Sequence, residues 1–188
     1  NVTRTIAEVS NYVYSSTKEG LYVNLYGSNA LNSVTEEGGK IQLHQQSNYP
    51  WDGAVAIIID KAPKKDYALF LRIPGWSNGT TVKVNGKEVN GTIVSGSYFK
   101  IVRKWKKGDS INLNIPMPVE LMQANPLVEE ARNQVAVKRG PIVYCLESNG
   151  ISTNASINDI VLDLNSEFKI ETIKATNRDL VVIKAQGY

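Results

Sequence analysis

The chain has 188 residues, with 21 lysines and arginines against 18 aspartates and glutamates, so its formal net charge is only +3. So small a charge gives no support to nucleic-acid binding. One cysteine and one histidine exclude an internal disulfide framework and a Cys/His zinc site built by this chain alone. No apolar run approaches the roughly 20 residues that cross a bilayer, so no membrane partner is predicted.

The chain opens with a helical pattern. Val2, Ile6, Val9 and Val13 recur at three- and four-residue spacings, which places them on one face of a helix over 2–16. Gly20 is expected to end this helix. An apolar helical face needs an apolar surface to cover it. The chain also begins without Met, so we expect it to be a fragment or a processed form.

From Leu21 onward the pattern changes to alternating residues or short apolar runs, which indicate β-strands. The predicted strands of the first half are 21–26, 41–45, 55–59, 67–73, 81–84, 87–89, 98–102 and 110–115. Asn85-Gly86 supplies the two positive-φ residues of a type I′ turn, so it predicts a tight hairpin. Residues 105–109 predict a second turn.

Pro116, Pro118 and Pro126 interrupt this pattern, because proline cannot occupy a central strand, and they predict a domain junction or a crossover. Further strands are predicted at 134–137, 142–146, 160–164, 168–173 and 180–184. The fold class is therefore mainly β, with antiparallel β-sandwiches preceded by one N-terminal α-helix. The expected domains are the helix in 1–19, a first sandwich in 20–125 and a second in 126–188.

Few side chains have the chemistry of a catalytic site. Cys145 lies in the apolar run 142–146, which is typical of a buried, inert thiol, and His44 is expected to face water. A Cys–His dyad is therefore not favoured. Glu36-Glu37 and Glu129-Glu130 lie in polar stretches that favour solvated charge over the paired acids of a glycosidase. No catalytic and no metal-binding residue is predicted in this chain.

Aromatic residues near strand ends are a better lead. Tyr49, Trp51 and Asp52 precede one predicted strand, and Trp76 follows another. Flat rings on loops stack on sugar rings, and a neighbouring aspartate binds hydroxyls. These four residues are our candidate carbohydrate contacts. The alternative is that the rings only close the open end of a sandwich.

Taken in order, several motifs resemble glycoside hydrolase family 127, the β-L-arabinofuranosidase family. They are Gly-Leu-Tyr-Val-Asn-Leu-Tyr at 20–26, Tyr-Pro-Trp-Asp-Gly at 49–53, Arg-Ile-Pro-Gly-Trp at 72–76, Val-Asn-Gly at 84–86, Trp-Lys-Lys-Gly-Asp at 105–109, Pro-Met-Pro at 116–118 and Arg-Gly-Pro-Ile-Val-Tyr at 139–144. The resemblance covers residues 1–147, and the ordered set is more specific than any single motif.

The resemblance implies a bacterial parent enzyme in which an (α/α)₆ barrel precedes β-sandwich domains. The family hydrolyses plant-type glycans with retention, through a zinc-bound cysteine nucleophile in the barrel. Asn1 matches the end of the family's Cys-Cys-Pro-x-Asn-like segment, so residues 2–16 match the barrel's last helix and the barrel is the expected partner. No catalytic or zinc residue of the family falls in this chain, and Cys145 matches none of them. The second sandwich is expected to be truncated or reduced.

Three functions remain open at this point. The first is a non-catalytic accessory region of a family-127-like glycosidase, with zinc in the parent and no cofactor in this chain. The second is an independent carbohydrate-binding module, in which Trp51, Trp76 or Trp105 forms an exposed platform. The third is a structural domain without a ligand. An exposed, coplanar pair of tryptophan rings would favour the module, and burial of all three indoles at the ends of the sandwich would favour the other two.

Overall fold

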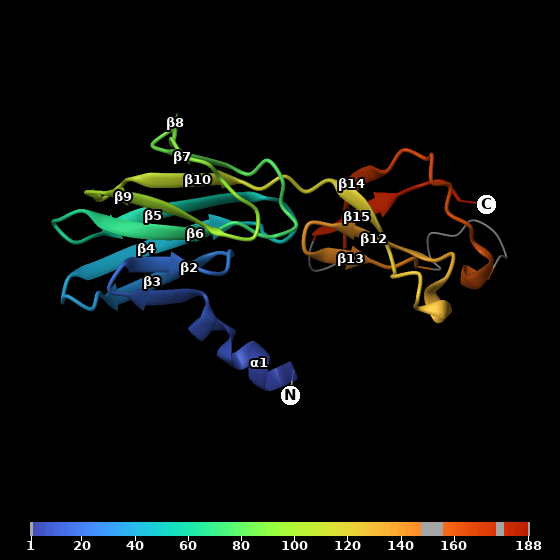
Figure 1. The fold of residues 1–188 in the computed structure, drawn as a ribbon, viewed down its shortest axis with the longest axis horizontal. Helices are drawn as coiled ribbons and strands as arrows, with labels where there is room; N and C mark the ends of the chain where they lie inside the picture. The colour runs from blue at the N-terminus through green and yellow to red at the C-terminus, as the bar shows by residue number, and fades with distance from the viewer. Residues whose placement is uncertain (1, 148–155, 176–178, 188) are drawn as a thin grey trace. The chain divides into compact units, whose positions relative to one another are not determined.

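The computed structural model describes residues 2–147, 156–175 and 179–187, which form a mainly β protein with one short N-terminal helix (Figure 1). The chain divides into two compact units, Asn1–Met117 and Pro118–Tyr188. The sequence pattern places the division after residue 125. Strand β11 (Val119–Gln123), which pairs with β12 (Val135–Arg139), lies between these two positions. Within the described ranges, no helix has the length and apolar character needed to cross a membrane.

The N-terminal helix is shorter than predicted. Helix α1 is Val2–Glu8, and a 3₁₀ helix, η1 (Val9–Tyr12), follows it. The predicted helix over 2–16 is wrong beyond this point, because Tyr14–Thr17 forms strand β1, which pairs antiparallel with β2 (Gly20–Val23). Tyrosine and threonine favour strands, and this pairing outweighs the helical spacing of the valines.

The first unit is a sandwich of two sheets. The four-stranded sheet has the order β1-β2-β6-β9, and the six-stranded sheet has the order β3-β4-β5-β10-β7-β8. The remaining strands are β3 (Asn29–Val34), β4 (Lys40–Ser47), β5 (Ala54–Lys61), β6 (Tyr67–Arg72), β7 (Thr81–Val84), β8 (Lys87–Glu88), β9 (Tyr98–Arg103) and β10 (Ser110–Asn114). All pairs in this unit are antiparallel except β2–β6, which is parallel.

Both sheets contribute to one buried core. Every second residue of β4 and β5 points inward, as the alternating pattern predicts. The inward residues of these two strands are Ile41, Leu43, Gln45, Val55, Ile57 and Ile59. The facing sheet contributes Leu21, Val23, Leu69 and Leu71 to the same cluster. Each fully buried aliphatic side chain stabilises the fold by about 1.5–3 kcal/mol, so this core holds the two sheets together.

The hairpin predicted at Asn85-Gly86 is confirmed. Asn85 has a φ of 51° and Gly86 has a φ of 77°. The flanking residues pair as Val84 with Lys87 and Lys83 with Glu88, so two residues form the turn between β7 and β8. Positive φ at both turn residues matches the twist of the flanking strands.

Two small antiparallel sheets are found among the described residues of the second unit. One is β11-β12-β13, with β13 at Ile142–Tyr144, and the other pairs β14 (Lys169–Lys174) with β15 (Asp179–Lys184). The described residues of this unit include the 3₁₀ helices η2 (Glu129–Ala131) and η4 (Ile157–Asp159). The predicted strand at 160–164 is wrong, since Leu162 forms only an isolated bridge with Gly187.

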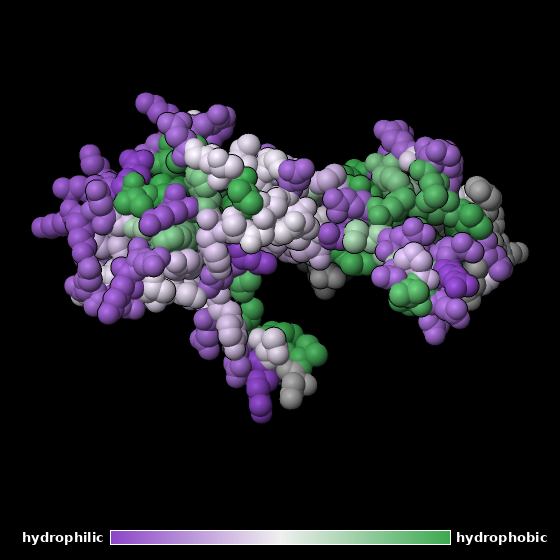
Figure 2. All heavy atoms as spheres, in the orientation of Figure 1, coloured by the Kyte–Doolittle hydropathy of each residue, from purple (hydrophilic) through white to green (hydrophobic). Residues whose placement is uncertain are grey.

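Hydrophobic side chains of the second unit lie at its surface. Leu127, Val143 and Leu164 are more than half exposed, and hydrophobic residues gather over this unit in Figure 2. In the part of the unit that the structure describes, no hydrophobic side chain is buried. The described residues therefore build no closed core comparable with that of the first unit.

Candidate functional site

The two candidates for nucleophilic chemistry lie in different units. Cys145 follows β13 and is exposed, so the prediction of a buried thiol is wrong. The described residues around it form no core that could bury the apolar run. His44 lies on β4, where its Nδ1 is 2.8 Å from Oδ2 of Asp60 and its side chain is 33% exposed. This geometry is that of a partly solvated surface pair.

The acidic pairs are solvated, as predicted. Glu36 and Glu37 lie in the exposed turn after β3, and Glu37 forms an ion pair with Lys65. This turn borders a polar pocket of about 180 Å³. Glu129 pairs with Arg132 across 3.2 Å at the surface of the second unit. Among the described residues, no group of three His, Cys, Asp or Glu side chains is arranged to hold a metal ion.

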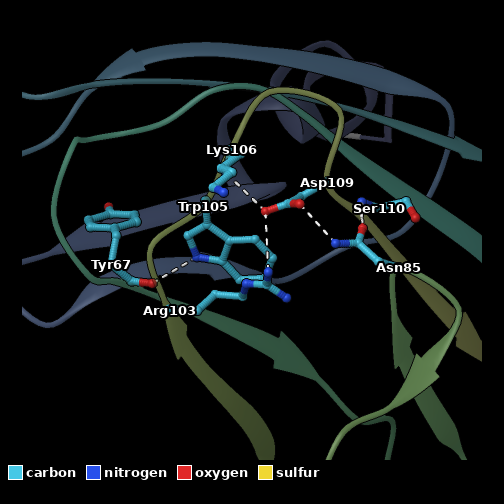
Figure 3. Close-up of polar contacts among 7 residues, drawn as sticks. All are labelled: Tyr67, Asn85, Arg103, Trp105, Lys106, Asp109 and Ser110. Carbon is cyan, nitrogen blue, oxygen red and sulfur yellow. Dashed lines mark hydrogen bonds and ion pairs between the residues drawn. The ribbon is translucent and has the colours of Figure 1, made fainter.

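Trp105 is buried, with 4% exposure. Its Nε1–H donates a hydrogen bond of 2.8 Å to the backbone oxygen of Tyr67, and the Arg103 guanidinium lies 5.3 Å from the centre of its ring (Figure 3). A ring in this position packs against the core and offers no open face to a sugar. Trp105 therefore does not form the exposed platform of a binding module.

Asp109, beside Trp105, links two turns. Its Oδ1 accepts a hydrogen bond from Nδ2 of Asn85, and its Oδ2 accepts one from the backbone N–H of Lys106 (Figure 3). Burial alone would raise the pKa of this carboxyl group. The two hydrogen bonds and the charge of Arg103, 3.7 Å away, outweigh burial and lower the pKa below its ordinary value. We infer a structural role for this network.

The predicted carbohydrate contacts lie in two loops. Tyr49, Trp51 and Asp52 belong to the loop between β4 and β5, and Trp76 follows β6; all four are half-buried. Tyr49 and Trp76 pack against the core. Asp52 Oδ1 accepts a hydrogen bond from the backbone N–H of Ala54. These residues close the sandwich and still leave part of each side chain at the surface.

Tyr49 belongs to an aromatic group that includes Tyr26. The two rings meet edge to face, with centroids 6.1 Å apart, and the hydroxyl of Tyr26 donates a hydrogen bond of 2.6 Å to the backbone oxygen of Arg72. Burial raises the pKa of both tyrosines, and the charge of Arg72 opposes this increase. Tyr26 was not a sequence candidate, because it lies in a predicted strand rather than in a loop.

Six residues on the outer side of the four-stranded sheet, here called the outer-face group, were also missed. They are Tyr22, Phe70, Arg72, Tyr98 and Lys100, which are neighbours in the β2, β6 and β9 register, and Asn24, which follows β2 and forms hydrogen bonds with Arg72 and Tyr98. Tyr22 stacks on Phe70, with centroids 4.1 Å apart, and Lys100 Nζ lies 5.3 Å from the Phe70 ring centre. One signal in the sequence was available: β6 is apolar at successive positions and not only at alternate ones, which indicates that both of its faces are covered.

Comparison with known proteins assigns the two units separately. The family model described as β-L-arabinofuranosidase, GH127 middle domain, matches residues 20–117. The model described as glycoside hydrolase family 127 C-terminal domain matches residues 119–179. The boundary between the two models coincides with the division of the structure after Met117.

Individual relatives agree with this assignment. The non-reducing end β-L-arabinofuranosidase of Bifidobacterium longum subsp. longum is 35% identical, and the alignment covers 78% of this chain but 22% of the relative. A solved structure described as a glycoside hydrolase has a TM-score of 0.90 and 38% identity, covering 96% of this chain and 30% of its own. A GH127 β-L-arabinofuranosidase from Geobacillus stearothermophilus T6 has a TM-score of 0.85 and 34% identity, covering 97% and 28%.

Proposed function

The chain belongs to glycoside hydrolase family 127, and we propose that it is a non-catalytic accessory region of a larger enzyme of this family. The models that match are those of a middle and a C-terminal domain, and the chain spans 22% of the curated relative. Glu37 and Glu129 form ion pairs with Lys65 and Arg132 at the surface. These observations favour an accessory role for this chain beside a separate catalytic domain.

The observation that carries the proposal is the exposed apolar face of α1. Val2 and Ile6 lie on α1, and Val9 follows them at the start of η1; the three residues are 75%, 67% and 46% exposed. Figure 2 shows hydrophobic side chains on the surface of this helical segment. Burying apolar surface yields about 25 cal/mol per Å². We propose that the catalytic domain of the parent enzyme packs against this apolar face and covers it.

The proposed parent activity is retaining hydrolysis of β-L-arabinofuranosides in plant-type glycans. The Bifidobacterium relative is described as a non-reducing end β-L-arabinofuranosidase. In this proposal the nucleophile and the zinc ion belong to the catalytic domain of the parent, as the resemblance to the family implies.

Tyr49, Trp51, Asp52 and Trp76 are the proposed carbohydrate contacts of this accessory region. Their partly exposed side chains support this role, since a loop at the end of a rigid sandwich can reach a neighbouring substrate cleft. For the alternative of an independent carbohydrate-binding module, Trp51 and Trp76 are the remaining candidate platform residues, because both are half-buried whereas Trp105 is buried.

An activity assay tests the accessory role. The purified 188-residue chain is incubated with an aryl β-L-arabinofuranoside, with the full-length Bifidobacterium enzyme as the positive control. We expect turnover by the control and none above the buffer blank by the chain. Turnover by the chain that disappears in Cys145→Ala would show that the chain carries its own nucleophile and would refute the proposal.

A further inference from the structure

The outer side of the four-stranded sheet is unusual for a sandwich, because aromatic residues cover it. Phe70 is only 7% exposed although it points away from the core, where Leu69 and Leu71 lie. The ring of Tyr22 stacks on Phe70 with an angle of 3° between the two planes. These rings form a second, external apolar layer beneath the groups that face solvent.

Tyr98 is the most exposed ring of the outer-face group, and it is held in place. Its ring stands at 82° to that of Tyr22, with centroids 5.1 Å apart, and 42% of the residue is exposed. Its hydroxyl donates a hydrogen bond of 2.8 Å to Oδ1 of Asn24, whose Nδ2 donates to Ser15 Oγ. A ring fixed before binding loses little conformational entropy when a ligand stacks on it.

Two cations flank this ring. Arg72 lies opposite Tyr98 in the β6–β9 register, and Lys100 lies two residues along β9 on the same face. One guanidinium N–H of Arg72 donates to the backbone oxygen of Asn24. Within the described ranges, neither cation forms an ion pair with a carboxylate. The nearby Glu19 accepts a hydrogen bond of 3.4 Å from the Tyr22 hydroxyl.

We propose that the outer-face group binds an acidic oligosaccharide, with a sugar ring stacked on Tyr98 and a carboxylate bound by Arg72 and Lys100. Guanidinium and ammonium groups are the natural partners of carboxylates, and a half-exposed tyrosine is suited to the apolar face of a sugar ring. The choice of a sugar over an acidic protein surface rests on the proposed role in a glycoside hydrolase. The site also differs in character from the face of α1, which is aliphatic.

Calorimetric titration of the 188-residue chain tests the site. The probes are an oligogalacturonide and an uncharged arabino-oligosaccharide of the same length. We expect the acidic probe to bind about tenfold more tightly than the neutral one, a difference of about 1.4 kcal/mol. Tyr98→Ala is expected to weaken binding of the acidic probe by about tenfold, whereas Tyr98→Phe keeps the ring and most of the affinity.

Charge variants separate the role of the cations from a general loss of positive charge. Arg72→Gln and Lys100→Gln should each weaken binding of the acidic probe about fivefold and make binding less sensitive to salt. Lys107→Gln removes the same charge from the exposed turn after β9 and should bind like the wild type. Circular dichroism of each variant verifies its fold.

Three results would overturn the inference. They are the absence of binding at millimolar oligogalacturonide, equal binding of the two probes, and equal affinities of Arg72→Gln, Lys100→Gln and Lys107→Gln. Binding of the isolated catalytic domain of a relative that Tyr98→Ala weakens, with neither sugar bound, would reassign the face to a protein contact and would also refute it. The titration does not depend on catalysis, so turnover by the chain would refute the accessory role while leaving the binding result intact.

Discussion

The side-chain amide of Asn85 donates a hydrogen bond of 2.8 Å to Asp109, joining the β7–β8 turn to the loop before β10. Asn85 also accepts a hydrogen bond at Oδ1 from the backbone N–H of Ser110. The same residue supplies one of the two positive-φ positions of the turn. Asparagine suits both tasks, because it tolerates this backbone conformation and carries both a donor and an acceptor.

Replacing Asp109 should destabilise the first unit. Asp109→Ala leaves the Asn85 amide and the Lys106 N–H without their acceptor, so we expect the free energy of unfolding to fall by about 1–3 kcal/mol. Urea unfolding followed by tryptophan fluorescence measures this change, since all three tryptophans belong to the first unit. Asp66→Ala, at an exposed position before β6, is the control and should change stability by less than about 0.5 kcal/mol. Similar losses in both variants would contradict the role of the network.

The contribution of Asp109 should also depend on pH. Its pKa is lowered in the folded protein, so the folded state favours the ionised carboxylate. The resulting stability is fully present above the unfolded pKa of about 3.9 and is lost as the pH falls through the lower folded pKa. We expect the stability difference between the wild type and Asp109→Asn to be largest near neutral pH and to shrink as the pH falls below the unfolded value of about 3.9. A stability difference that stays constant as the pH falls would show that the negative charge of Asp109 does not stabilise the folded state.

Local turn chemistry made part of the fold predictable from sequence. The Asn85-Gly86 hairpin needs only two adjacent residues that tolerate positive φ, so the prediction did not depend on distant contacts. Strand β3 was missed, because its alternation of polar and small residues, Asn-Ala-Leu-Asn-Ser-Val, lacks a strong apolar period. Strand β11 was missed because prolines flank it, although it pairs along its whole length with β12.

The candidate surface was predictable only in part. Aromatic residues in predicted loops, such as Tyr49 and Trp76, can be chosen as candidates from the sequence. The residues that contact them in the folded chain cannot be identified in this way. Arg72 and Tyr98 become neighbours only through the pairing of β6 with β9, and Tyr22 joins them through the parallel β2–β6 pair. Such juxtapositions depend on strand order, which the spacing of residues along one chain does not specify.

The exposed apolar residues of α1 and η1 lead to a prediction about the binding of a hydrophobic dye to the chain. Ile6→Asp and Val9→Asp should reduce the fluorescence of a hydrophobic dye bound to the chain, because each places a charge on the apolar face. The urea midpoint of the first unit should stay unchanged, since neither side chain belongs to the core cluster. Ala7→Asp, at an exposed position on the opposite side of the helix, is the matched control and should keep the dye signal. A lowered urea midpoint in Ile6→Asp would show that the helix packs on the β-sandwich of the first unit.

Gly53 leads to a prediction about the loop that carries Tyr49, Trp51 and Asp52. The backbone of Ile115 passes close to Gly53 and donates an N–H hydrogen bond of 2.9 Å to its oxygen. A Cβ atom at position 53 would lie 1.8 Å from the backbone oxygen of Ile115, so one of the two segments would have to move. We expect Gly53→Ala to lower the free energy of unfolding by about 3 kcal/mol, at the upper end of the cost of overpacking.

A second glycine provides the control for this prediction. A Cβ atom on Gly75 would have its nearest neighbour at 3.8 Å, an ordinary van der Waals contact, so Gly75→Ala should change stability by less than about 1 kcal/mol. Urea unfolding of both variants, monitored by tryptophan fluorescence, makes the comparison. If Gly53→Ala proves as stable as Gly75→Ala, the loop does not depend on its close approach to Ile115. The glycine of the Tyr-Pro-Trp-Asp-Gly motif would then need another explanation.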